Sequence, residues 1–265
     1  GSEMTSRLHE RTALVTGASR GIGRAIARCM ALDGAWVAVH YGHDDASAAQ
    51  TVREIEQAGG QAVAVRCELG RHDDADRLFG TLEPLLPGCR LDILINNAGG
   101  NLGTGAIETT TVDEFDRIVA RNAHTPYFLI QRALPLLRDG GRIINISSAD
   151  TRIAITSELA YSMAKGALTV LGRTLALALG DRGITVNTVA PGITETDQNA
   201  WLHASDEIRA ASASGTALNR IGQPDDIADI VAFLASDDAR WITGHLVDAT
   251  GGTYLGPRMA TPAVY

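Results

Sequence analysis

The only lysine of this 265-residue chain lies four residues after a tyrosine, in the segment Tyr161-Ser162-Met163-Ala164-Lys165. Side chains four residues apart on a helix share one face, one turn apart. Free tyrosine has a pKa of about 10 and exchanges protons poorly at neutral pH. A neighbouring ammonium group favours the phenolate and lowers that pKa, towards the range useful for general acid–base catalysis. Tyr161 and Lys165 are therefore a candidate acid–base pair; the alternative is a lysine spaced by accident on a solvated helix face.

A glycine-rich segment near the start of the chain is typical of phosphate binding. Residues 16–23 read Thr-Gly-Ala-Ser-Arg-Gly-Ile-Gly, follow an apolar run and open a segment of helical period. Glycines permit a tight turn and let the backbone approach a pyrophosphate, whose charge is stabilised by the helix N-terminus. The segment predicts a nucleotide site, and a turn that needs glycine only for packing is the alternative.

Short apolar runs alternate with segments of helical period along the chain. The predicted strands are residues 12–16, 35–40, 62–66, 91–95, 142–147, 185–190 and 245–248, and the predicted helices are residues 22–32, 46–58, 73–86, 112–138, 158–179 and 225–235. Pro126 and Pro135 should kink or divide the fourth helix. Strands that are continuous Val, Ile, Ala and Leu runs belong in a parallel sheet covered on both faces. The pattern predicts an α/β fold, a doubly wound parallel sheet with right-handed crossovers and helices on both faces.

Composition narrows the class of protein. With 45% hydrophobic residues and a mean hydropathy of +0.02, residues 1–265 are expected to form one soluble domain. No apolar run approaches the ~20 residues of a membrane helix, and the N-terminus shows no signal pattern. A net charge of −8 without a basic cluster argues against nucleic acid and anionic membranes as partners. Cys29, Cys67 and Cys89 lack metal-ligand spacing, so we expect no metal and reduced packing cysteines in a cytoplasmic protein.

Three segments stand apart from the regular alternation. Residues 1–10 form an N-terminal extension, in which Gly1 and Ser2 before Met4 are typical of an expression-tag remnant. Residues 193–220 are the least regular stretch. They follow a strand on the edge where such sheets bind ligands, so we expect a substrate lid. Residues 252–265 form a tail that two prolines make too irregular for another helix.

The sequence resembles the short-chain dehydrogenase/reductase family over nearly the whole chain. The glycine segment has the spacing Gly-x-x-x-Gly-x-Gly, one residue longer than the common dinucleotide fingerprint. The other matching motifs are Asn96-Asn97-Ala98-Gly99, Asn122, Ser147-Ser148, Tyr161-x-x-x-Lys165 and Pro191-Gly192-Ile193-Thr194-Glu195-Thr196. The resemblance implies a single Rossmann-type domain with a seven-stranded sheet, a nicotinamide cofactor and a homotetramer.

The resemblance also implies a role for each matching position. Tyr161 would give a proton to a carbonyl, and Lys165 would hold the nicotinamide ribose and lower the tyrosine pKa. Ser148 would hydrogen-bond the substrate oxygen, because strand alternation points Ser147 to the other face. Asn122 would anchor a water that links Lys165 to solvent. The alternatives are a strand-end cap for Ser148 and a helix-interior hydrogen bond for Asn122. The implied cofactor contacts are Gly17, Ser19, Arg20, Gly21, Ile22, Gly23, Tyr41, Glu68, Leu69, Asn97, Ala98, Gly99, Tyr161, Lys165, Pro191, Gly192, Thr194 and Thr196.

The end of the second strand favours NADP(H) over NAD(H). An acidic residue there would bind the adenosine ribose 2′-hydroxyl and repel a 2′-phosphate, but the expected position holds Tyr41. Arg20 can face a phosphate with its planar fork of donors; the alternative is a solvated surface arginine. Asp44 and Asp45 follow closely and argue for NAD(H). Glu68 replaces the aspartate that family members usually carry for the adenine amine, so the adenine pocket must adjust.

The closest general resemblance is to 3-oxoacyl carrier-protein reductases and to ketoreductases of secondary metabolism. Members of the first group present arginines that dock an acidic carrier, whereas the matching positions here are Asp139 and Leu177. Acyl carrier protein is therefore a possible but not a favoured partner. We predict NADPH-dependent reduction of a small-molecule ketone to a secondary alcohol. Trp201 in the lid can stack on an aromatic substrate or serve packing.

Two other functions fit the same residues. An alcohol or sugar dehydrogenase would use them in the oxidative direction. A non-catalytic nucleotide-sensing protein would be expected to lack the tyrosine or the lysine, and both are present. Epimerases and dehydratases of the extended branch share the Tyr-x-x-x-Lys pair. They differ from this sequence in having a shorter glycine loop and a longer C-terminal substrate domain.

The helices at residues 112–138 and 158–179 are apolar on more than one face, and the surplus needs a partner. We therefore expect a homotetramer whose tail crosses a subunit interface. The alternative is a disordered tail on a dimer.

Overall fold

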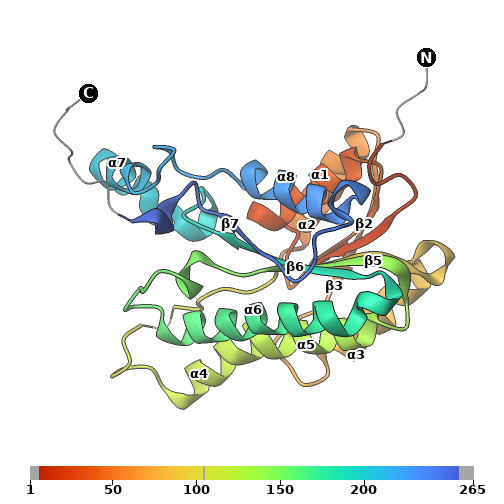
Figure 1. The fold of residues 1–265 in the computed structure, drawn as a ribbon, viewed down its shortest axis with the longest axis horizontal. Coiled ribbons are helices and arrows are strands. Elements are labelled where there is room, and N and C mark those ends of the chain that lie inside the picture. The colour runs from red at the N-terminus through yellow and green to blue at the C-terminus, as the bar shows by residue number, and fades with distance from the viewer. Residues whose placement is uncertain (1–5, 104, 257–265) are drawn as a thin grey trace.

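The computed structural model describes residues 6–103 and 105–256, which form a single parallel sheet between two layers of helices (Figure 1). The sheet has seven strands in the order β3-β2-β1-β4-β5-β6-β7. Their bounds are β1 Thr12–Val15, β2 Trp36–Tyr41, β3 Gln61–Arg66, β4 Leu91–Asn96, β5 Leu137–Ile146, β6 Thr185–Pro191 and β7 Leu246–Ala249. The strand order reverses between β1 and β4, the point where doubly wound sheets bind ligands. The predicted Rossmann-type fold is confirmed.

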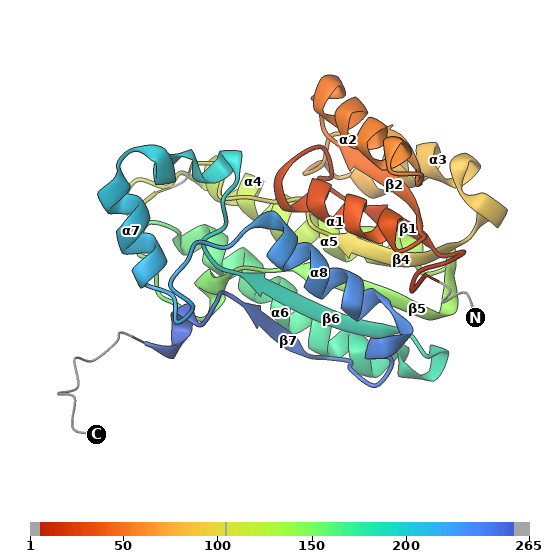
Figure 2. The same ribbon diagram turned by 90° about the horizontal axis from the view of Figure 1, so that it is seen from above.

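Helices cover both faces of the sheet, as Figures 1 and 2 show. One layer holds α1 Gly21–Leu32, α2 Asp45–Gln57 and α8 Pro224–Ala235, and the other holds α3 Asp74–Leu82, α4 Val112–Val119, α5 Thr125–Ala133 and α6 Leu159–Leu179. Alternate strand residues enter opposite cores. In β4, for example, Ile93 and Ile95 join the core under α1 and α8, while Leu94 joins the other. Burial on both faces explains why the strands are continuous apolar runs.

The predicted helix at residues 112–138 is divided, as expected from its prolines, but its predicted end is wrong. It consists of α4, a π-helical turn at Ala120–His124, and α5, which ends at Ala133 before β5 begins. Pro126 lies in the first turn of α5. Because proline has no N–H to give to the carbonyl four residues earlier, the helix changes its hydrogen-bonding pattern just before it. The predicted helix at residues 73–86 likewise ends early, with a 3-10 turn at Glu83–Leu85.

The predicted lid is more regular than expected. It contains a 3-10 helix at Asp197–His203 and the helix α7 Asp206–Ser214. The side chain of Ser205 caps α7 by accepting a hydrogen bond from the N–H of Ile208 at 3.1 Å. The helix α7 is rich in Ala and Ser and buries none of its residues, so no apolar stripe marks it in the sequence.

Two smaller expectations need correction. Leu8 is 1% exposed and its N–H donates to the carbonyl of Asp33 at 2.8 Å, so part of the predicted N-terminal extension joins the core. Cys67 is buried but Cys89 is exposed, and the packing interpretation is wrong for the latter. Residues 1–5 and most of the predicted tail, residues 257–265, lie outside the described residues. Among the described helices, none combines the length and apolarity needed to cross a bilayer.

Candidate active site

The carboxyl ends of the parallel strands meet at one edge of the sheet, and the loops that leave them carry the predicted site residues. The glycine loop follows β1, Tyr41 ends β2, and Glu68 and Leu69 follow β3. Asn97, Ala98 and Gly99 follow β4, Ser148 follows β5, and Pro191 ends β6. The sequence separates these residues by more than 170 positions, and the sheet topology brings them together.

The glycine loop forms a cradle that larger residues would fill. Gly17 and Gly21 have φ values of +62° and +58°, which favour glycine. A Cβ atom on Gly23 would lie 2.0 Å from the carbonyl oxygen of Gly17. The first turn of α1 follows at once, and its N–H groups have no acceptors within the helix. These residues fit the pyrophosphate of a nicotinamide dinucleotide.

Asn97 fixes the glycine loop to the segment after β4. Its Nδ2 donates to the carbonyl oxygens of Thr16 and Gly17, each at 3.1 Å. The hydroxyl of Thr16 accepts from the N–H groups of Asn97 and Ala98 at 3.0 and 2.9 Å. The side chain of Asn97 therefore shapes the cofactor cradle, and a direct contact with the cofactor stays a prediction.

Lys165 is buried, with 3% of its surface exposed, on the inner face of α6. Its Nζ donates to the carbonyl oxygen of Ile146 at 2.9 Å, at the end of β5. Burial lowers the pKa of Lys165 to about 8, because a low-dielectric environment disfavours the charged ammonium. The interpretation as a solvated lysine is therefore wrong.

Tyr161 lies beside this lysine, but its pKa moves against the expectation. Burial raises the pKa of Tyr161 above its ordinary value, the charges of Asp150 and Glu158 add to the rise, and a hydrogen bond with Ser148 opposes it. The Nζ of Lys165 lies 5.8 Å from the centre of the Tyr161 ring, so its charge does not outweigh desolvation. The predicted lowering by Lys165 is wrong for this arrangement. Tyr161 holds its proton at neutral pH, as a proton donor must.

The two serines after β5 face different elements. The side chain of Ser148 lies close enough to Tyr161 to lower its pKa, and its Oγ accepts from the N–H of Asp150 at 3.2 Å. The Oγ of Ser147 lies 3.0 Å from the hydroxyl of Thr169 on α6. Strand alternation explains the separation. Ser148 is therefore both a cap of the turn that follows and a neighbour of the tyrosine.

Asn122 lies in the π-helical turn and is fully buried. Its Oδ1 accepts from the N–H of Gly100 at 3.0 Å, and its Nδ2 donates to the carbonyls of Gly100 and Ile118, each at 2.9 Å. A Cβ atom on Gly99 would lie 2.4 Å from Asn122 Oδ1 and 3.1 Å from Lys165 Nζ. Gly99 thus lies close to both Asn122 and Lys165, and a bridging water stays a prediction.

The acidic residues after β2 form hydrogen bonds and an ion pair with neighbouring residues. The hydroxyl of Tyr41 donates to Asp45 at 2.6 Å, and Arg66 lies 3.3 Å from the same carboxylate. Asp44 caps α2 by accepting from the N–H of Ser47 at 3.0 Å. Both carboxylates therefore lose part of their power to repel a phosphate.

A pocket of about 520 Å³ opens beside these residues. Its lining includes two arginines and is formed by Gly42, His43, Arg66, Cys67, Glu68 and Arg77. Arg66 and Arg77 belong to no sequence motif and were not predicted, although Arg66 lies two residues before Glu68. Glu68 itself is exposed, and its carbonyl oxygen accepts from Arg77 at 2.8 Å. Arg20 is exposed at the N-terminus of α1 and acts electrostatically on Asp44.

The chain after β6 crosses the glycine loop. A Cβ atom on Gly21 would lie 3.6 Å from the methyl group of Thr196. Thr194 is 2% exposed, and its hydroxyl donates to the carbonyl of Gly192 at 3.0 Å. Farther along, Trp201 is 46% exposed and donates from Nε1 to Asn199 at 3.2 Å. The start of the lid is therefore part of the site.

A pair of carboxyl groups beside Tyr161 escaped the sequence analysis. A hydrogen bond between Asp150 and Glu158 raises the pKa of Glu158 to about 7, with burial and the charge of Asp150 as further causes. Asn101 donates to Glu158 at 3.3 Å and opposes the rise. Neither acid belongs to a motif. Asp150 comes two residues after Ser148, and Glu158 comes three residues before Tyr161. This closeness in the sequence was the available signal that both acids lie at the site.

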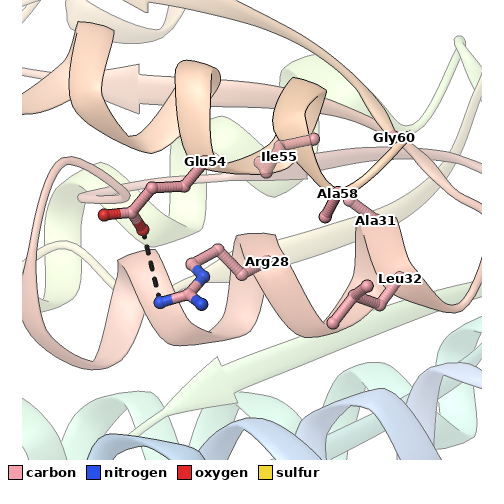
Figure 3. Close-up of a pocket in the computed structure, with 7 residues that line it drawn as sticks. All are labelled: Arg28, Ala31, Leu32, Glu54, Ile55, Ala58 and Gly60. Carbon is pink, nitrogen blue, oxygen red and sulfur yellow. Dashed lines mark ion pairs between the residues drawn. The ribbon is translucent and has the colours of Figure 1, made fainter.

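Among the described residues, neither a metal-binding cluster nor the cavity of Figure 3 forms a second centre. In the described part of the chain, no three His, Cys, Asp or Glu side chains are placed to hold a metal ion. The cavity in Figure 3 measures about 30 Å³ and lies between α1 and α2, where Arg28 pairs with Glu54 at 3.3 Å. It is lined in part by Gly60, at the amino end of β3, on the opposite edge from the glycine loop, and it is too small for a nucleotide.

Comparison with known proteins agrees with this geometry. The family model described as enoyl-(acyl carrier protein) reductase matches residues 17–254. Versicolorin reductase of Emericella nidulans is 37% identical over 259 residues, which cover 94% of this chain and 97% of the relative. The chain belongs to the short-chain dehydrogenase/reductase family. It is an oxidoreductase.

Two solved short-chain dehydrogenase/reductase structures are particularly similar. The angucycline C-6 ketoreductase LanV with bound NADP is 48% identical, has a TM-score of 0.90, and covers 95% of this chain and 98% of its own. LanV has also been solved with rabelomycin. LugOII, described as catalysing keto-reduction at C1 in lugdunomycin biosynthesis, is 48% identical with a TM-score of 0.90, over 94% of this chain and 100% of its own.

The carboxyl pair predicts a pH dependence of catalysis. Below pH ~7 Glu158 holds a proton, and above it the added negative charge makes Tyr161 a weaker proton donor. We expect kcat/KM for ketone reduction to fall about fivefold as pH rises through 7, the effect of ~1 kcal/mol. Glu158→Gln should remove this inflection, whereas Glu56→Gln on the exposed face of α2 should keep it. An inflection near pH 7 that persists in Glu158→Gln contradicts the assignment.

Proposed function

We propose that this short-chain dehydrogenase/reductase reduces a ketone of a small polycyclic, polyketide-like molecule to a secondary alcohol with NADPH. The observation that carries the proposal is the proximity of Ser148 to a partly buried, protonated Tyr161, beside the buried Lys165 and the glycine cradle. The relatives support the substrate class, because LanV is named as an angucycline ketoreductase and was solved with rabelomycin.

The reaction follows from what each side chain can do. A bound nicotinamide cofactor would lie in the glycine cradle with its ribose towards Lys165, and it supplies hydride to the carbonyl carbon. Negative charge then develops on the substrate oxygen, where the hydroxyls of Ser148 and Tyr161 can donate hydrogen bonds. The N–H of Asp150 already donates to the Ser148 oxygen, which leaves the serine proton for the substrate. Tyr161 transfers its proton to the oxygen and completes the alcohol.

Reduction begins with a protonated donor, and Tyr161 holds its proton at neutral pH. An oxidative alcohol dehydrogenase would use the same side chains with the phenolate as the base. The cofactor therefore decides between the two directions, and a preference for NADPH supports reduction. A nucleotide sensor without catalysis would have no need for a tyrosine held against Ser148.

NADPH is favoured over NADH by the groups around the adenosine end. Asp44 and Asp45 are engaged with Ser47, Tyr41 and Arg66. Arg20 stands exposed within reach of Asp44 and is available to a 2′-phosphate. LanV was solved with NADP. Arg66 and Arg77 add positive charge to the neighbouring pocket.

For assembly we retain the homotetramer as a proposal. Apolar side chains are exposed along α5 and α6: Tyr127 at 49%, Met163 and Val170 at 63%, and Leu177 at 88%. Such a surface is typical of a protein interface.

Leu177 and Asp139 occupy the positions where a carrier protein would meet arginines, and Asp139 pairs with Arg182 at 2.8 Å. A free small molecule is therefore the proposed substrate, and a cytoplasmic location stays a prediction.

Tyr161→Phe tests the proposed function most simply. The substitution removes the transferable proton and keeps the ring, so NADPH consumption with an accepted polycyclic ketone should fall at least ~10²-fold. Fluorescence titration should show little change in NADPH affinity. Tyr127→Phe, on the exposed face of α5, is the control and should retain full turnover. Near wild-type turnover in Tyr161→Phe would exclude this residue as the acid.

Arg20→Ala tests the choice of cofactor. Only NADPH carries the 2′-phosphate, so the substitution should weaken NADPH binding by ~1.5–3 kcal/mol, the scale of a charged hydrogen bond, and barely affect NADH. Arg53→Ala, an exposed arginine on α2, is the control and should leave both affinities unchanged. If titration shows equal losses for NADPH and NADH in Arg20→Ala, Arg20 is not the group that reads the phosphate.

A further inference from the structure

The imidazole of His40 lies buried beneath the glycine loop, with 2% of its surface exposed. Its Nδ1 accepts from the N–H of Gly17 at 3.0 Å, and its Nε2 lies 2.8 Å from the carbonyl oxygen of Cys67. A backbone amide only donates and a carbonyl only accepts, so the proton must reside on Nε2 and the ring must be neutral. Burial also lowers the pKa of His40 to about 4, which keeps the ring neutral at physiological pH.

The two partners of this ring belong to different parts of the proposed cofactor site. Gly17 begins the glycine loop, and Cys67 lies directly before Glu68 and lines the basic pocket after β3. The carbonyl oxygen of His40 also accepts from the N–H of Ala18 at 2.8 Å. One residue of β2 therefore holds two successive amides of the loop and ties them to the neighbouring strand.

Other contacts hold the loop but leave the Gly17 amide to His40. Asn97 binds the carbonyl oxygen of Gly17 at 3.1 Å. Thr51 donates towards the carbonyl oxygens of Ala18 and Ser19 at 3.0 and 3.2 Å. These side chains bind carbonyl groups, whereas His40 supplies an acceptor for an N–H. Without that acceptor the partly buried amide of Gly17 would lose its hydrogen bond, and the peptide plane there could turn.

We propose that His40 is a positioning residue that sets the distance between the glycine loop and the end of β3, and so shapes the cradle for the cofactor pyrophosphate. The inference rests on the proposed nicotinamide cofactor. The pyrophosphate is common to NADPH and NADH, so loss of this contact must weaken both by the same factor. This equal loss of affinity for both cofactors distinguishes the role of His40 from that of Arg20, which is proposed to bind the 2′-phosphate.

A pair of substitutions separates the two hydrogen bonds of the ring. His40→Asn places an amide oxygen near the position of Nδ1 and can still accept from Gly17. His40→Gln places an N–H near the position of Nε2 and can still donate to Cys67. Affinities for NADPH and NADH are measured by fluorescence titration, and melting temperatures are measured without cofactor. We expect His40→Asn to bind both cofactors within about twofold of wild type, and His40→Gln to bind both about tenfold more weakly.

The melting temperatures provide the control, because each variant loses one buried hydrogen bond and both should be destabilised to a similar degree. Affinity losses of equal size in the two variants would show that His40 only stabilises the fold, and would overturn the proposal. A loss confined to NADPH would overturn it as well.

A measurement on the wild-type protein does not depend on how the variants fold. The ¹⁵N spectrum of the His40 imidazole should show the proton on Nε2, unchanged from pH 8 to pH ~5.5, because the ring titrates well below that range. A proton on Nδ1 would overturn the proposal. Wild-type protein that binds neither cofactor would reject the proposed function, and the tautomer would still decide whether His40 holds the loop.

Discussion

The burial of the only lysine is the constraint on which the rest of the site depends. An ammonium group taken out of water is costly unless hydrogen bonds compensate. The observed compensation is the carbonyl oxygen of Ile146, where β5 ends. This bond places α6 against the strand, and Tyr161, one turn earlier on α6, comes to lie beside Ser148. Gly99 must remain glycine, because a Cβ atom there would meet both Lys165 and Asn122.

The cofactor side of the site is held in a similar way by buried polar contacts between neighbouring loops. Asn97 from the segment after β4 and Thr51 from α2 bind carbonyl groups of the glycine loop, and His40 from β2 binds an amide. These side chains have no reactive role. Their hydrogen bonds fix the peptide groups of the loop, so that the cradle exists before any ligand arrives. The short-chain dehydrogenase/reductase site is thus largely a product of its supporting contacts.

The sequence predicted the strands and the fold class well, because apolar runs are local properties, and the sheet topology brings the motif residues to one edge. The sequence did not predict the features that depend on tertiary contacts. The π-helical turn that carries Asn122 and the helix α7 in the lid leave no periodic apolar pattern. The raised pKa of Tyr161 depends on burial and on Asp150 and Glu158, and these acids lie in no motif. The contact of His40 with Gly17 joins residues 23 positions apart in the sequence, and only the folded sheet shows it.

Because the chain has one lysine, its ionisation can be followed directly. Protein labelled with ¹³C at lysine Cε should give one lysine resonance, whose chemical shift reports the charge of Nζ. We expect a titration midpoint at about 8 for Lys165, and a shift of the resonance when NADP⁺ is added, because the ribose would bind beside it. A midpoint near the ~10.4 of an exposed lysine, with no response to NADP⁺, would contradict the buried lysine as the organising group of the site.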